Sequence, residues 1–143
     1  MDILSISILV FIILEISNVF ILYFKTDSKL GNGVSVFDHF HESKKDPLLH
    51  EFVKYLVYWV AGTKLIFISL LIVILLFGNE TLKIASLTVL ILSILSFYYR
   101  LYPIIKNLDK NEKISPRGYS KILNLMIISF ISMFSIALVI SIK

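Results

Sequence analysis

Residues 52–77 read FVKYLVYWVAGTKLIFISLLIVILLF, an apolar run with a lysine, Lys64, near its middle. A helix needs about 20 apolar residues to cross the hydrocarbon core of a bilayer, and this run is longer than that. Just before it, Asp46-Pro47 is typical of a helix N-cap followed by proline at the first helical position. The sequence therefore predicts a helix from Pro47 to Phe77 that crosses a membrane from about residue 52 onward.

The chain contains three further apolar runs, at about residues 3–24, 82–105 and 119–142. Hydrophobic residues make up 57% of its 143 residues, above the roughly 45–50% of soluble domains. The lack of cysteine excludes disulfides, iron–sulfur clusters and cysteine nucleophiles. We expect an all-α integral membrane protein in which residues 1–143 form a single membrane domain, an antiparallel four-transmembrane-helix bundle.

Two polar segments, residues 25–51 and 106–118, form the longer loops between these runs. In the first loop, Gly31-Asn32-Gly33 is typical of a turn, and Ser35-Val36-Phe37-Asp38 has the S-x-x-D form of a helix N-terminus. We therefore expect a short interfacial helix from about Val36 to Lys44 in this loop.

The second and third runs are joined by the short connection Gly78-Asn79-Glu80-Thr81. Glycine is placed to end the helix before it, and Thr81 is placed to cap the helix after it. Pro103 falls in the expected last turn of the third helix, where a kink costs least. The second and third helices are thus predicted to form an antiparallel hairpin.

The basic residues are concentrated on the side of the two longer loops, and only Lys83 and Lys143 lie on the other side. On the loop side they are Lys25, Lys29, Lys44, Lys45, Lys54, Arg100, Lys106, Lys110, Lys113, Arg117 and Lys121. The positive-inside rule then places both loops in the cytoplasm and both termini outside. We expect the basic loops to meet anionic lipid headgroups, and we expect no nucleic-acid partner.

All the tyrosines and Trp59 fall at or near the predicted cytoplasmic ends of the helices. Those expected to form the interfacial aromatic belt are Tyr55, Tyr58, Trp59, Tyr98, Tyr99 and Tyr102. An amphipathic ring at this level keeps its polar tip in water. A second interpretation is that some of these rings line a cavity open to the cytoplasm.

Two charges lie deep within apolar runs. Glu15 is ten residues from Lys25, and Lys64 is ten residues from Lys54, so each lies about 15 Å inside the same interface. A charge at a helix centre costs roughly 2.5–3.5 kcal/mol on insertion scales, so exposure to lipid is disfavoured. We expect Glu15 and Lys64 to face the bundle interior, with Asn18 one turn from Glu15. In the functional interpretation they form a pair or flank a polar cavity. In the alternative they form a permanent ion pair that only fixes helix packing.

The third helix carries Ser86, Ser93 and Arg100 at intervals of seven residues, which places them on one stripe. Ser93 and Arg100 are therefore candidate binding residues together with Glu15, Asn18 and Lys64. For Arg100 the simpler interpretation is that its side chain snorkels to the interface.

The three histidines, His39, His41 and His50, lie in the first loop among acidic residues. Neither His41-Glu42 nor His50-Glu51 continues into the H-E-x-x-H zinc motif. His39 and His41 would point to different faces of a helix. We predict no metal site, no cofactor and no catalytic residue.

Leu14-Glu15-Ile16, a glutamate in the middle of the first helix of a small four-helix protein, resembles the small multidrug resistance transporters. That resemblance implies a carboxylate that exchanges protons for cationic drugs. It covers one helix and one residue. The chain departs from the family in its greater length, its long first loop, the presence of Lys64 and the lack of a glycine-rich packing helix, so we do not assign it to that family.

Three functions fit the sequence. The first is a small transporter or channel subunit, a homo-oligomer or one with a partner membrane protein, in which the Glu/Lys pair moves a proton, an ion or a small solute. The second is a non-transporting assembly, immunity or regulatory subunit in which the pair is an internal brace. The third is a lipid enzyme at the membrane surface, which requires the loop histidines and acidic residues to converge.

Overall fold

The computed structural model describes residues 1–30 and 33–142. Within these ranges the chain forms helices joined by turns, with no β-strand. Four helical segments are long and apolar enough to cross a membrane. They are α1 (Ile3–Phe24), α3 (Pro47–Phe77), α4 (Glu80–Leu95) continued by α5 (Phe97–Lys110), and α6 (Tyr119–Ser141). The prediction of an all-helical protein with four apolar helices is confirmed, and their length and composition indicate a membrane protein.

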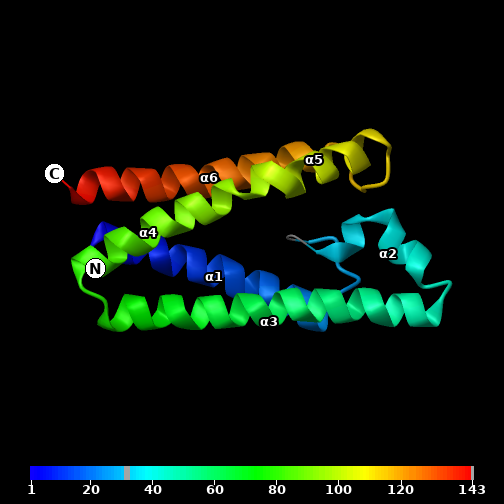
Figure 1. Ribbon diagram of the computed structural model, residues 1–143, viewed down its shortest axis with the longest axis horizontal. Helices are drawn as coiled ribbons and strands as arrows, with labels where there is room; N and C mark the ends of the chain where they lie inside the picture. Colours follow the sequence, from blue (N-terminus) through cyan, green and yellow to red (C-terminus); the bar gives the residue numbers. More distant parts are fainter. Residues whose placement is uncertain (31–32, 143) are drawn as a thin grey trace.

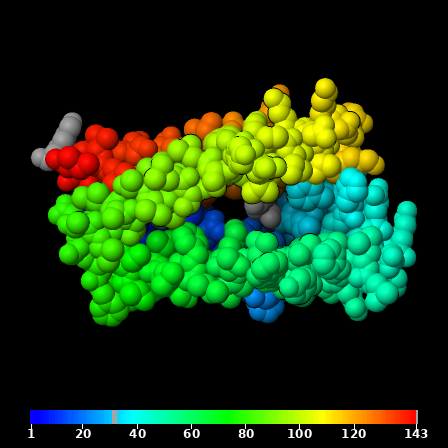
Figure 2. Space-filling view, in the orientation of Figure 1, coloured from blue at the N-terminus to red at the C-terminus, as the bar shows by residue number. Residues whose placement is uncertain are grey.

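The four segments lie along the long axis of the molecule (Figure 1). The N- and C-termini and the turn between α3 and α4 lie at one end, whereas both longer loops lie at the other. Helix α1 packs against α3, α6 and α4. Figure 2 shows a gap between α3 and the α4–α5 segment along part of their length, and α1 is visible through it. Helix α1 is therefore the element on which the others are arranged.

The core around α1 is built on an aromatic contact. Phe11 meets Phe67 of α3 and both Phe130 and Phe134 of α6 edge to face, with ring centroids 5.8, 5.0 and 5.2 Å away. Such pairs contribute about 0.5–1.5 kcal/mol each beyond their buried area. This contact fixes α3 and α6 on α1 at the level just before Glu15.

Polar side chains cap the helices at the end that carries the termini. Asp2 accepts hydrogen bonds from the Ser5 backbone N–H at 2.7 Å and from Lys83 of α4 at 3.1 Å. The Thr81 cap is wrong, because the Asn79 side chain accepts the N–H of Leu82 at 2.9 Å and α4 already begins at Glu80. Asparagine at the corner of the turn is as good an N-cap as threonine.

At the other end the predicted start of α3 is confirmed. The Asp46 side chain accepts the N–H groups of Leu48 and Leu49, with Pro47 at the first helical position. The S-x-x-D cap is wrong, because α2 (Asp38–Ser43) begins after Phe37 without a side-chain cap. A 3-10 turn, η1 (Val34–Val36), precedes it. Of the predicted turn Gly31-Asn32-Gly33, the first two residues lie outside the described ranges.

The third predicted helix differs in its end and its continuity. Instead of ending near residue 105, the segment runs from Glu80 to Lys110 and is interrupted at Ser96. There the backbone N–H donates to the carbonyls of both Leu92 and Ser93, at 3.3 and 3.2 Å, which tightens the turn. Pro103 lies inside α5, not in a last turn, and the loop that follows begins only at residue 111.

The two longer loops are joined to each other. The Asp38 N–H donates to the Lys113 carbonyl at 3.0 Å, and the Ser115 N–H donates to the Val36 carbonyl at 2.8 Å. Beneath these bonds a second apolar core contains Val36, Ile105, Ile114, Tyr119 and Leu123. We call these five residues the loop-end core.

Candidate functional site

The two mid-helix charges meet. The Lys64 ammonium of α3 donates to Glu15 Oε2 and to Asn18 Oδ1 of α1, both at 2.7 Å. Glu15 and Asn18 are three residues apart on one face of α1, which lets a single lysine reach both. We call Glu15, Asn18 and Lys64 the midhelix cluster.

Small residues of α3 bring the cluster together. Ala61 is fully buried, and a side chain added at Gly62 would lie 3.3 Å from the Tyr23 hydroxyl of α1. Such residues let two helices approach closely. Because they lie within one turn before Lys64, the lysine side chain starts close to α1 and its ammonium can insert between Glu15 and Asn18.

The cluster is only partly shielded. The side chains of Glu15 and Lys64 are 17% and 25% exposed. They border a cavity of about 280 Å³ between α1, α3 and α6. Its walls are Leu14, Glu15, Ser17, Asn18, Ile21, Lys64, Met126 and Phe130. The site thus combines opposite charges, an amide and apolar walls around a space large enough for a small solute or several waters.

Asn18 has an unsatisfied hydrogen-bond donor. The residue is 9% exposed, and its Nδ2 has no partner among the described residues. The lysine fixes the orientation of the amide, because only Oδ1 can accept from the Lys64 ammonium. A buried donor without an acceptor costs about 1–3 kcal/mol. The amide therefore presents an N–H group that requires an acceptor.

The structure does not bring the other candidate binding residues to the cluster. Ser93 and Arg100 are exposed on α4 and α5. The Arg100 guanidinium lies over the Tyr99 ring, 5.1 Å from its centroid. Nothing in these contacts assigns either residue to a ligand.

Some rings of the predicted aromatic belt are exposed, and the others contact neighbouring residues. Tyr55, Trp59 and Tyr99 are exposed. The Tyr98 hydroxyl donates to Asn124 Oδ1 at 2.9 Å and so ties α5 to α6. Tyr58 stacks on Tyr23 of α1, with ring centroids 5.7 Å apart. Tyr102 packs edge to face on Tyr98.

The loop histidines make local contacts. His41 Nε2 lies 2.9 Å from the Ser35 carbonyl oxygen, and His50 Nδ1 lies 2.9 Å from Ser43 Oγ. Both rings pack against Phe40. The His41 contact holds α2 against η1, and the His50 contact holds it against the start of α3. No three acidic or histidine side chains in the described ranges converge as metal ligands would.

Sequence reasoning missed Met126 and Phe130 as walls of the cavity and Lys83 as the partner of Asp2. The two wall residues carry no signal, because they are apolar residues in an apolar helix. Lys83 did carry a signal, because it is the only lysine or arginine that the structure describes at the end of the molecule with the termini. Comparisons with protein-family models, curated proteins and solved structures find no match to this chain.

Proposed function

We propose that the chain is a subunit of a small multi-pass membrane transporter or channel that moves a proton, an ion or a small solute past the midhelix cluster. In this proposal the four apolar segments form an antiparallel transmembrane bundle. Helix α2 lies at the membrane surface, both longer loops face the cytoplasm and both termini lie outside. The distribution of basic residues supports this orientation.

The observation that carries the proposal is the unsatisfied Asn18 amide beside the cavity. A brace between helices gains most when every buried polar group has a partner, because a half-satisfied network is less stable than an apolar contact. The cluster instead keeps a donor without an acceptor and leaves both charges partly accessible. This arrangement favours reversible binding of a ligand at the cluster over a purely structural contact.

The pair supplies a simple exchange. Lys64 neutralises Glu15 in the structure, so an empty site carries no net charge within the membrane. A proton or cation that binds the Glu15 carboxylate weakens its bond to Lys64, and the freed ammonium then needs a new acceptor. Asn18 Oδ1 already accepts from that ammonium and can hold it meanwhile. Lys64 thus has two states, one bonded to the Glu15 carboxylate and one released from it. A site that alternately binds and releases a ligand needs at least two such states.

An oligomer completes the proposed transporter. Only 17%, 11% and 17% of the apolar windows of α3, α4–α5 and α6 are buried in the single chain. A cavity of about 280 Å³ does not cross the molecule. A second copy or a partner membrane protein on these faces would extend the cavity into a path.

The test is ion or proton flux into proteoliposomes that contain the purified chain, with thermal stability recorded on the same samples. The variants are Glu15→Gln and the double variant Glu15→Gln/Lys64→Met. The control is Glu80→Gln, which removes an acidic charge in the first turn of α4 away from the cluster. Flux in wild type and control, and none in two folded cluster variants, supports transport through the cluster.

The second candidate is the non-transporting subunit with the cluster as a brace, and the closed ion pair at 2.7 Å favours it. Replacement of both partners of a buried pair is often neutral, so a brace survives in the double variant. Absence of flux from every sample, with instability only in Glu15→Gln, would exclude the transporter and direct the search to a binding partner.

A further inference from the structure

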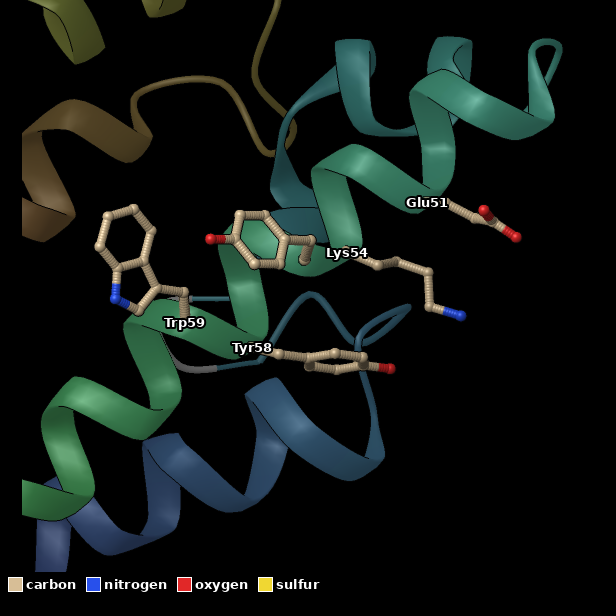
Figure 3. Close-up of a pocket in the computed structure, with 5 residues that line it drawn as sticks. Glu51, Lys54, Tyr58 and Trp59 are labelled. Atoms are coloured by element: carbon tan, nitrogen blue, oxygen red, sulfur yellow. The ribbon is translucent and has the colours of Figure 1, made fainter.

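A second polar site lies on α3 between residues 51 and 59, before Lys64 of the midhelix cluster. Figure 3 shows a groove there, with Glu51 and Lys54 extended to the same side of the helix and Trp59 at the other end. The groove has a volume of about 530 Å³, and Tyr55 and Tyr58 complete its walls. All five residues belong to α3. Tyr55 and Trp59 are exposed, whereas Tyr58 stacks on Tyr23 of α1.

The charges at the head of the groove are opposite and unpaired. Among the ion pairs and hydrogen bonds of the described residues, none involves the side chain of Glu51 or Lys54. The two residues are three apart on the helix, which places them about 5–6 Å from each other at Cβ. The groove therefore offers one hydrogen-bond acceptor with a negative charge and one donor with a positive charge, side by side.

An aromatic wall leads from these charges along the helix. Phe52, Tyr55 and Trp59 follow one another with ring centroids 6.4 and 6.1 Å apart. At Trp59 the groove meets a second one of about 420 Å³, which passes Lys64 of the midhelix cluster and reaches Phe67. Glu51 and Phe67 are 16 residues apart, or about 24 Å along the axis. One leaflet with its headgroups measures roughly 20–22 Å, so the two grooves together have the length of one lipid.

We propose that this groove binds a phospholipid with a primary-amine headgroup, of the phosphatidylethanolamine class. Lys54 donates to the lipid phosphate, and the lipid ammonium donates to the Glu51 carboxylate. These two groups of the lipid are separated by only two methylenes, which suits charges one helical turn apart. The acyl chains lie along Trp59 toward Phe67. The proposal requires α3 to cross the membrane, but it does not depend on transport by the midhelix cluster.

The charge pattern selects among lipids. An acidic lipid without an amine satisfies Lys54 but brings its negative charge close to Glu51. A choline lipid has a quaternary ammonium, which has no N–H to donate to the Glu51 carboxylate. A second copy related by a two-fold axis can also pair each charge with its opposite on the partner, and a dimer is therefore one outcome of the test. Among these lipids, only the amine lipid satisfies both side chains at once.

Trp59 gives a direct assay, because it is the only tryptophan of the chain and it borders both grooves. The full chain is reconstituted in phosphatidylcholine vesicles that contain increasing fractions of lipid with brominated acyl chains. Bromine quenches tryptophan fluorescence on contact. The brominated lipid carries an ethanolamine, glycerol or choline headgroup, and the mole fraction that gives half-maximal quenching is compared among the three.

We expect half-maximal quenching at an ethanolamine-lipid fraction about two- to fivefold lower than for the choline lipid, the range that an exposed ion pair supports. Glu51→Gln should remove this preference, whereas Glu80→Gln, which lies outside the groove, should keep it. Lys54→Gln should weaken quenching by all three lipids. Equal quenching by the three headgroups in wild type overturns the proposal. So does a preference for the glycerol lipid, or Trp59 shielded from every brominated lipid in a cross-linkable dimer.

Discussion

Replacement of Glu15 by glutamine should destabilise the protein, and additional replacement of Lys64 by methionine should restore most of the loss. Removal of one partner of a fully buried ion pair costs about 3–5 kcal/mol, because the other charge stays buried alone. Here the Lys64 side chain is 25% exposed and still donates to Asn18 Oδ1. We therefore expect about 2 kcal/mol for Glu15→Gln, or a fall in Tm of about 4–8 °C for a chain of this size.

The double variant has no buried charge. The amide of the new glutamine can donate to Asn18 Oδ1 in place of the lysine, so we expect the double variant within about 1 kcal/mol of wild type. The assay is thermal unfolding of wild type, both single variants and the double variant in one detergent, from which the coupling energy between the positions is calculated. Glu80→Gln is again the control, and we expect it to change stability by less than about 1 kcal/mol.

A double variant as unstable as Glu15→Gln alone would refute the reasoning, because the lysine would then not depend on the carboxylate. An unchanged Tm in Glu15→Gln would refute it too. This experiment tests the contact itself. Whether the contact also serves transport is decided by the flux measurement.

Three further predictions concern the packing around the cluster and at the two ends of the molecule. Asp2→Ala should lower stability at neutral pH by about 0.5–2 kcal/mol through loss of the N-cap. The pKa of Asp2 lies well below its usual range, first because the Ser5 backbone N–H donates to its carboxylate. A lowered folded pKa means that this stabilisation is present above about pH 4 and is lost as the pH falls, so thermal scans of variant and wild type should converge in acid. Ala61→Leu should destabilise by about 1–3 kcal/mol, because the fully buried alanine lies where α1 and α3 meet and a larger side chain overpacks that contact; unfolding in denaturant measures it, and wild-type stability would contradict the close approach of the helices. Ile114→Ala, at a position 2% exposed in the loop-end core, removes about 2–5 kcal/mol of packing. Hydrogen exchange of the Asp38 amide should then be faster in the variant than in wild type, while exchange in α1 stays unchanged. An unchanged exchange rate at Asp38 would show that the bonds between the loops do not depend on this contact.

Some helix boundaries were predictable from local signals, although the S-x-x-D and Thr81 signals were wrong. The apolar run of α1 and the Asp46-Pro47 start of α3 both lie where the sequence places them. The end of the third segment was not predictable in the same way. Polar residues after Ile105 are typical of a loop, yet α5 continues to Lys110, because Ile105 belongs to the loop-end core and Leu108 packs against it. Tertiary contacts decide such an end, and a single sequence does not contain them.

The candidate site was predictable in part for a physical reason. A charge in the centre of an apolar helix needs a partner or a polar cavity, so the sequence predicts that Glu15 and Lys64 both face the interior, with direct contact as one of two alternatives. The spacing of three residues added Asn18. Ser93 and Arg100 do not lie at the midhelix cluster. Their spacing of seven residues shows that they share a helix face, but it does not show which way that face points. The cavity and its apolar walls on α6 depend on packing alone.

The bond between Lys64 and Glu15 joins residues 49 positions apart, on α3 and α1. It therefore bears on how the chain enters the membrane during synthesis. A lysine at the centre of a bilayer costs about 2.5–3.5 kcal/mol, and α3 finds its compensating carboxylate only if α1 has not yet diffused away. At about 5–20 residues per second, the ribosome needs roughly 2–10 s to add the intervening chain. We expect α1 to wait at the insertion machinery for that time, so that α1 and α3 pass into the lipid as a joined pair.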